Sequence, residues 1–143
     1  MNAAQDSMHA GMLWPLRLLP GDDLRAALQA AVAARGARAA FVLAGIGSLR
    51  PACVRLAGAD APLRLDGDLE LLSLSGTIAA NGVHLHLSVA DADGRVIGGH
   101  AAAGCIVRTT AEVLLAPLPG WDFAREPDPR TGWQELVIRP RPG

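Results

Sequence analysis

Three of the four histidines in the chain lie in one short stretch, HLHLSVADADGRVIGGH, which runs from His84 to His100. The residues from His84 to Val89 alternate between polar and apolar types, a pattern typical of a strand with one buried face. Since side chains two residues apart in a strand share a face, His84 and His86 are expected to stand side by side. Imidazole is a common metal ligand, so this stretch suggests the binding of a metal ion.

Whether His100 joins the pair depends on the length of the turn between the two strands. A three-residue loop over 92–94, with Gly94 in the left-handed conformation, is a common hairpin form and would place His100 opposite His86. A two-residue loop of Asp93 and Gly94 would instead turn His100 to the other face of the sheet. A bulge at the two glycines that precede His100 could restore the shared face.

If the three rings converge, they supply three of the four ligands of a tetrahedral zinc site, at about 2.0–2.1 Å from the ion. The fourth position could hold water, a small ligand or a side chain from a neighbouring subunit. Histidine-rich sites also accept nickel, copper, cobalt or iron, so the ligand set indicates zinc or another divalent transition metal. The alternative interpretation is that the histidines are hydrogen-bonded polar residues on a half-exposed face of a sheet.

A catalytic metal site also needs an acid–base residue near the ion, and the sequence offers one candidate for this role. Glu112, in the stretch TTAEV, could serve, or it could be an ordinary solvent-facing glutamate in a strand. The sequence contains no recognisable site for an organic cofactor. Whether the protein is an enzyme is therefore left open, and the expectation is metal binding without an assigned reaction.

The elements that would position these residues are one helix and a series of strands. The acidic stretch PGDD, apolar residues at positions 24, 28 and 32, and Gly36 predict a helix over 22–35 with one apolar face. Beyond this helix the chain is predicted to form strands joined by turns rich in glycine, aspartate and proline. We therefore expect an α+β domain with a mixed, mostly antiparallel sheet of about seven or eight strands and one main helix.

The 143 residues suit a single domain with a substantial core. We expect residues 1–13 to be a flexible N-terminal tail and residues 14–143 to form the domain. Residues 119–143 form an extension rich in proline and tryptophan, with a final strand at QELVIRP. The side chains of Trp121 and Trp133 are expected to pack against the body of the domain or against a neighbouring subunit, and so to anchor this extension.

The balance of charges argues against a protein that binds DNA through its own surface. Thirteen basic residues, all of them arginine, stand against fourteen acidic ones, which gives a formal net charge of −1. Neutralised phosphates supply most of the affinity for DNA, so a DNA-binding domain usually has a basic excess. Aromatic residues make up 3% of the chain, which is too few for a base-stacking platform.

The sequence also predicts the compartment. Charged residues interrupt every apolar run before it could span a bilayer, and the N-terminus lacks the basic start and apolar core of a signal peptide. Cys53 and Cys105 lie in apolar, strand-like stretches, and two cysteines do not make a disulfide framework. We therefore expect a cytoplasmic protein with buried thiols and no contact with a membrane.

Five stretches of residues 16–118 resemble, in order, a known family: LLPGDDL, GIGSL, GDLELLSLSGTI, the histidine hairpin and TTAEV. They are similar to the plant-and-prokaryote-conserved (PPC) domain, also called DUF296, in its stand-alone bacterial form. The resemblance implies an α+β domain that assembles as a homotrimer, and some prokaryotic members hold a metal ion with histidines. Plant members carry AT-hooks and act as nuclear DNA-binding regulators, and the bacterial members share the DNA-binding label by association.

Two departures from the plant pattern weaken the transfer of the DNA-binding role. Residues 67–72 read GDLELL, with Asp68 where plant members have an arginine. The AT-hook core Arg-Gly-Arg-Pro is absent, and the C-terminal RPRPG has a proline ring that would obstruct entry into the minor groove. We therefore expect a homotrimeric PPC protein that binds zinc through three residues, His84, His86 and His100. The alternatives are a zinc-dependent enzyme acting on a small molecule, or a regulator that acts through protein partners.

Overall fold

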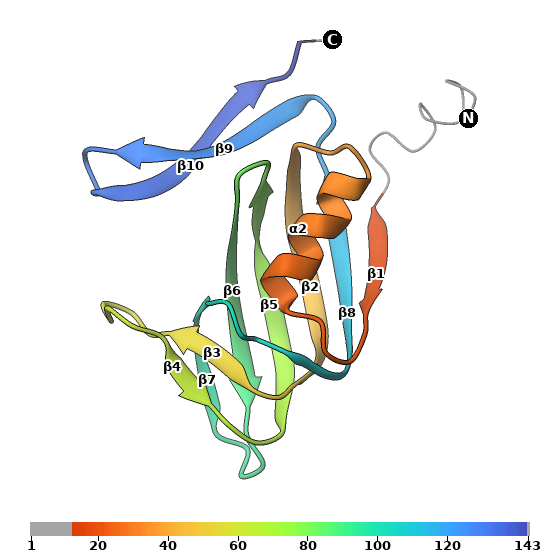
Figure 1. Cartoon of the computed structure of the whole chain (residues 1–143), viewed down its shortest axis with the longest axis vertical. Helices are drawn as coiled ribbons and strands as arrows, with labels where there is room; N and C mark the ends of the chain where they lie inside the picture. The colour runs from red at the N-terminus through yellow and green to blue at the C-terminus, as the bar shows by residue number, and fades with distance from the viewer. Residues whose placement is uncertain (1–12, 143) are drawn as a thin grey trace.

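The computed structural model describes residues 13–142 of the chain. Within these residues it contains one α-helix, α2 (Leu24–Ala34), and ten β-strands (Figure 1). The strands, in chain order, are β1 (Trp14–Leu18), β2 (Ala39–Leu49), β3 (Ala52–Arg55), β4 (Leu63–Leu65), β5 (Leu69–Ala79), β6 (Gly82–Ala90), β7 (Val96–Ala101), β8 (Val107–Pro117), β9 (Trp121–Asp128) and β10 (Trp133–Pro140). Residues 1–12 of the predicted N-terminal tail lie outside the described part.

Eight of the strands form one antiparallel sheet in the order β1-β8-β2-β5-β6-β7-β3-β4, and β9 and β10 pair only with each other. Figure 1 shows α2 lying across the long strands of the sheet, with β3, β4 and β7 gathered at one end and the β9–β10 hairpin at the other. The predicted α+β fold, with one main helix and a mostly antiparallel sheet, is confirmed.

The helix begins close to its predicted start and buries one face. The Asp23 side chain caps it by accepting a hydrogen bond from the Ala26 amide at 3.1 Å. The face that packs on the sheet consists of three buried residues at helical spacing, Leu24, Leu28 and Val32. The helix has 11 residues, and no helix in the described part of the chain is long and apolar enough to cross a membrane.

The β9–β10 hairpin was only half predicted, because the sequence indicates β10 but not β9. The β9 sequence, WDFAREPD, mixes charges with a proline and lacks the alternation that marks a strand. Phe123 of β9 is buried with Ala39 and Ala79, at the ends of β2 and β5. Trp121 and Trp133 are 43% and 70% exposed, so Phe123 rather than either tryptophan anchors the hairpin to the domain. A contact of the tryptophans with a neighbouring subunit stays a prediction.

Reciprocal hydrogen bonds hold β9 beside the beginning of β6. The Asn81 side-chain amide donates to the Arg125 carbonyl oxygen at 2.9 Å, and the Arg125 amide donates to Asn81 Oδ1 at 2.7 Å. The Arg125 guanidinium also donates to Thr77 Oγ1 at 3.0 Å. These contacts place the Arg125 side chain next to the first residues of β6.

Both cysteines are unpaired, as the sequence indicates. Cys105 is buried and Cys53 is half-buried. The Cys105 thiol donates a hydrogen bond to the Cys53 carbonyl oxygen at 3.2 Å, and burial raises the pKa of Cys105 to about 11. The Cys105 thiol is therefore protonated, and unreactive as a nucleophile, at neutral pH.

Candidate metal centre

The turn between β6 and β7 is a three-residue loop. The Asp91 amide donates to the Arg95 carbonyl oxygen at 3.0 Å, and the Gly94 amide donates to the Asp91 carbonyl oxygen at 3.0 Å. Gly94 has a φ of +77°, the left-handed conformation that glycine adopts without a steric penalty. The Asp91 carboxylate accepts the amides of Asp93 and Arg95, both at 2.9 Å, which fixes the loop further. Of the alternatives left open by the sequence, the three-residue loop is confirmed.

This loop sets the register that the site requires. His86 lies directly opposite His100 in the β6–β7 ladder, and Ser88 lies opposite Gly98. No residue is inserted between these pairs, so His100 shares a face with His84 and His86 without the aid of a bulge. The other face of β6 is buried in the core through four residues, Val83, Leu85, Leu87 and Val89. A shift of one residue would exchange the histidines for the core residues, so burial keeps the three rings on one side.

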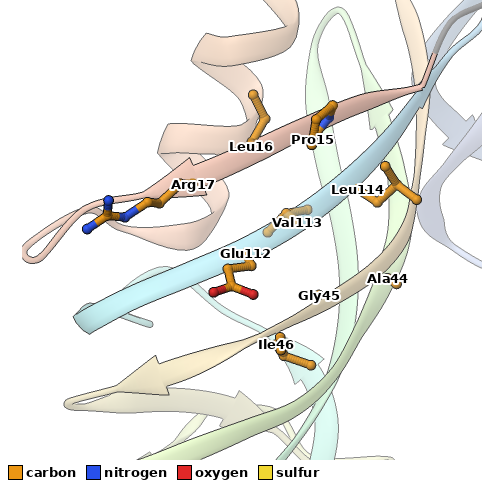
Figure 2. A pocket seen from close by; sticks show the side chains of 9 residues that line it. All are labelled: Pro15, Leu16, Arg17, Ala44, Gly45, Ile46, Glu112, Val113 and Leu114. Carbon is orange, nitrogen blue, oxygen red and sulfur yellow. The ribbon is translucent and has the colours of Figure 1, made fainter.

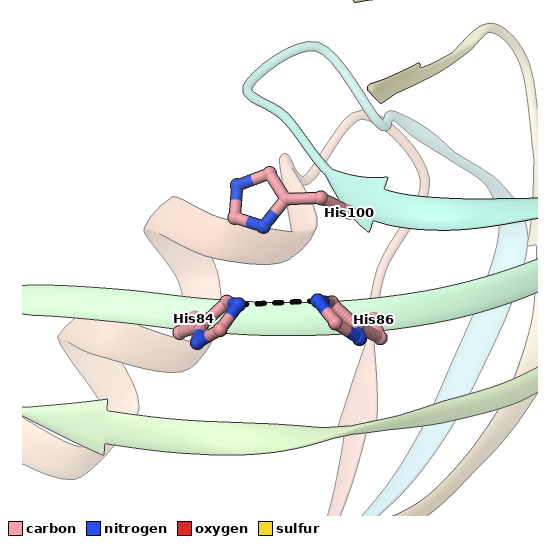
Figure 3. Close-up of side chains that lie close together, drawn as sticks. All are labelled: His84, His86 and His100. Carbon is pink, nitrogen blue, oxygen red and sulfur yellow. Dashed lines mark hydrogen bonds between the residues drawn. The ribbon is translucent and has the colours of Figure 1, made fainter. Parts of the chain in front are cut away.

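The three rings form a compact cluster (Figure 3). One ligand atom from each ring lies within 4.8 Å of the others. The Nε2 atoms of His84 and His86 are 3.1 Å apart, close to the roughly 3.3 Å expected between two nitrogen ligands of one tetrahedral zinc ion. In Figure 3 the His100 ring stands over this pair, with its Nδ1 atom turned toward it.

The chemistry of these nitrogens fits a metal ion better than it fits the hydrogen bonds that the protein supplies. The Nδ1 atom of His100 is buried and has no hydrogen-bond partner among the described residues. A buried polar atom without a partner costs about 1–3 kcal/mol, a cost that a bound cation would remove. Between His84 and His86 only one of the two facing Nε2 atoms can carry a proton, so at least one lone pair points into the cluster.

The surroundings keep two of the rings uncharged, which is the state that binds metals. Burial lowers the pKa of His100 to about 4, with a further contribution from His84. Burial, followed by the nearby Arg125 guanidinium, also lowers the pKa of His84. Both rings are therefore neutral at pH 7, and protons compete weakly with a metal for their nitrogens.

The lowered pKa of His100 predicts how the stability of the metal-free protein depends on pH. Because the folded state disfavours the charged ring, the unfolded chain binds a proton first as the pH falls below about 6.5. This contribution to the free energy of unfolding is complete above that pH and is lost progressively as the pH falls towards 4. Urea unfolding of the EDTA-treated protein at pH 7 and pH 5 should show the decrease. The His100→Gln variant should show a smaller one, and an equal decrease in both proteins would contradict the assignment.

A pocket of about 740 Å³ opens beside His84 and His100. It is lined by residues of α2, β6, β7, β9 and β10, by the end of β3 and the loop after it, and by the turn before β6. Apart from the two histidines, its charged or titratable lining residues are Arg25, Arg55, Arg125 and Glu135. No pattern within the sequence marks these four residues, because each comes from a different element and they meet only in the folded chain.

The structure does not bring Glu112 together with the histidines. Glu112 lies in β8, and β2 and β5 separate β8 from β6 in the sheet. The Glu112 side chain is exposed and lines a different pocket, of about 630 Å³, with Arg17 and Ile46 on the adjoining strands (Figure 2). This position fits the interpretation of Glu112 as a solvent-facing strand residue. The acidic side chain that lines the histidine pocket is Glu135.

The chain is similar in sequence and structure to a known protein family and to several solved structures. The family model for the Plants and Prokaryotes Conserved (PCC) domain matches residues 5–119. A hypothetical protein from Salmonella enterica is 41% identical in its solved structure, which has a TM-score of 0.87 and covers 92% of this chain and 95% of its own. A metal-containing protein from Archaeoglobus fulgidus is 29% identical, with a TM-score of 0.79, over 90% of this chain and 94% of that one.

A curated relative is considerably longer. The bifunctional protein GlmU of Synechococcus sp. (strain JA-2-3B'a(2-13)) is 47% identical over 131 residues, which cover 92% of this chain and 21% of that protein. The chain therefore spans about a fifth of the length of the curated relatives that it matches.

Proposed function

The chain belongs to the Plants and Prokaryotes Conserved (PCC, or PPC) domain family, and we propose that it binds zinc, or another divalent transition metal, through three histidines. The ligand atoms are Nε2 of His84, Nε2 of His86 and Nδ1 of His100. The observation that carries the proposal is the convergence of three imidazole nitrogens from two neighbouring strands within 4.8 Å. Three neutral nitrogen ligands are a set that zinc readily accepts.

Two further observations support a metal rather than a simple histidine cluster. The buried His100 Nδ1 has no partner among the described residues, and a cation would satisfy it. The Archaeoglobus fulgidus protein, 29% identical over 90% of this chain, is itself a metal-containing protein. Bound in this way, a divalent ion would supply a Lewis acid at the edge of the pocket, able to polarise a water molecule or an oxygen of a ligand.

Metal analysis of the purified protein tests the proposal. We expect close to one equivalent of metal per chain, and less than about a tenth of an equivalent in His86→Ala, because two imidazoles hold zinc much more weakly than three. The matched control is His9→Ala, which removes the remaining histidine of the chain and should leave the metal content unchanged. A His86→Ala protein that retains the full equivalent of zinc would show that the metal is held elsewhere.

We also propose that the protein is a homotrimer, as the family resemblance implies. The sheet exposes several large apolar side chains on two neighbouring long strands, a surface more typical of an interface than of a monomer: Phe41, Leu43, Ile46 and Leu72. Sedimentation equilibrium of the pure protein should give a mass of about 44 kDa, three times the 14.8 kDa of one chain. A mass of one chain at micromolar concentration would overturn the proposal.

DNA binding receives no comparable support from the molecule. The chain has one more acidic residue than basic residues, and the described arginines are largely paired with carboxylates or gathered around the histidine pocket. Because a basic surface supplies most of the affinity of DNA-binding domains, we propose the metal site rather than a nucleic-acid interface as the functional centre.

A further inference from the structure

Three arginines converge on the pocket beside the histidines from different parts of the chain. Arg25 is in the first turn of α2, Arg55 is the last residue of β3, and Arg125 is in β9. Figure 1 shows the β9–β10 hairpin at the end of the sheet where β6 begins, so the hairpin contributes one wall of the pocket. The pocket thus combines three guanidinium groups with two of the three histidines.

These guanidinium groups differ from most others in the protein because none of them forms an ion pair with a carboxylate of residues 13–142. Seven arginines of the described residues form ion pairs with aspartate or glutamate at 4.0 Å or less, and Arg25, Arg55 and Arg125 are not among them. Each donates instead to a neutral oxygen. Arg25 donates to the Ala101 carbonyl at 3.1 Å, while Arg125 donates to Thr77 Oγ1 at 3.0 Å. A guanidinium has five N–H donors, so most of them stay free for a ligand.

The described residues that line the pocket balance its positive charge only in part. Three arginines and one acid, Glu135, line it, which leaves a net charge of +2 when the histidines are neutral. Burial lowers the pKa of Arg125, and the nearby positive charge of Arg25 lowers it further. Partly buried like charges are unfavourable unless an anion lies among them, and guanidinium groups match the geometry of carboxylate and phosphate oxygens.

The shape of the pocket indicates the size of the anion. Its volume of about 740 Å³ lies within the range of about 300–1,000 Å³ that is usual for small-molecule sites. The indole ring of Trp133, 70% exposed, lines the same pocket and offers a flat apolar surface to a ligand. An inorganic ion would leave most of this space and the indole unused.

We propose that this pocket binds a small organic anion, whose carboxylate or phosphate group is held by Arg25, Arg55 and Arg125 beside the histidine cluster. The inference deepens the proposed metal site, because the same anion would lie next to the bound ion. The arginine contacts themselves do not depend on the metal. Trp133 is expected to cover the organic part of the ligand.

Binding of two aromatic anions to the full-length protein tests this inference. The probes are phenyl phosphate and benzoate, measured by isothermal titration calorimetry with zinc-loaded and with EDTA-treated protein. At least one probe should bind, and the stronger one identifies the anionic group that the site prefers. Arg55→Gln and Arg125→Gln should each weaken this binding at least about 10-fold, the usual effect of losing a charge-assisted hydrogen bond. No binding of either probe at millimolar concentration, with either form of the protein, would overturn the inference.

The control is Arg130→Gln, which removes an exposed arginine at the turn of the same hairpin. Arg130 pairs with Asp128 and lies outside the pocket, so its loss should leave the affinity unchanged. Thermal melts of each variant show whether it is folded. Arg55→Gln, which alters neither α2 nor the hairpin, keeps the test valid if Arg125→Gln destabilises the protein. Equal affinities in all four folded proteins would contradict the assignment of the arginines.

The same experiments separate this inference from the metal proposal. If the protein holds no metal but its affinity for the anion still depends on Arg55 and Arg125, the metal proposal fails and the anion site stands. If the protein binds one equivalent of zinc that His86→Ala removes, and no probe binds, the metal site stands and the anion site fails.

Discussion

Replacing His100 with alanine is expected to lower the affinity for zinc at least about 100-fold. Structural zinc sites with four ligands provide about 10–16 kcal/mol of binding energy, so a single ligand accounts for roughly 3 kcal/mol. His100 also contributes the buried Nδ1 atom that has no other partner in the described part of the chain. Competition titration of the metal-free protein with a chromophoric zinc chelator measures the change in Kd directly.

Ser88→Ala provides the matched control for His100→Ala. Ser88 is on the same strand and the same face as His84 and His86, but its hydroxyl is hydrogen-bonded to Ser73 at 2.6 Å rather than directed to the cluster. Its removal should change the zinc affinity less than about 3-fold, since it alters no ligand. A His100→Ala protein with the affinity of the wild type would mean that two histidines, without the third, account for binding.

Removing the metal is expected to lower the melting temperature by about 10 °C. A ligand that binds only the folded state stabilises it by about 4.1 kcal/mol when its free concentration is 1,000 times Kd. For a domain of about 150 residues, each kcal/mol corresponds to about 2–4 °C in Tm. Differential scanning calorimetry of the protein with excess zinc, and after treatment with EDTA, measures this shift.

The histidine variants show whether this stabilisation arises from the proposed site. His86→Ala should melt at the same temperature with and without zinc, because it lacks the site that couples metal binding to folding. The wild-type shift should also grow with zinc concentration, as linkage requires. A shift of equal size in His86→Ala would assign the stabilisation to a different metal site.

The hairpin at the site shows what local sequence reasoning can predict. The alternation of β6 and the residues of the loop determine which side chains share a face, and both are properties of adjacent residues. Gly94 takes the left-handed conformation and Asp91 closes the loop. These few consecutive positions therefore determine the length of the loop, and the length of the loop places His100 opposite His86 on the same face of the sheet. The helix was predicted for the same reason, because its cap and its apolar spacing are local.

The features that sequence reasoning missed depend on contacts between distant segments. Arg25, Arg55 and Arg125 occur singly in a helix, a strand and the terminal hairpin, and no spacing relates them. The strand β9 was missed because its charges and Pro127 obscure the alternation, although pairing with β10 and burial of Phe123 stabilise it. Only the order of the strands, itself a long-range property, shows that Glu112 lies away from the histidines.

The most direct test of the metal site is a crystal structure of the zinc-loaded protein with anomalous diffraction data collected on both sides of the zinc absorption edge. We predict one strong anomalous peak per chain, within about 2.0–2.1 Å of Nε2 of His84, Nε2 of His86 and Nδ1 of His100. A peak elsewhere, or a His100 ring turned away from the other two, would contradict the account.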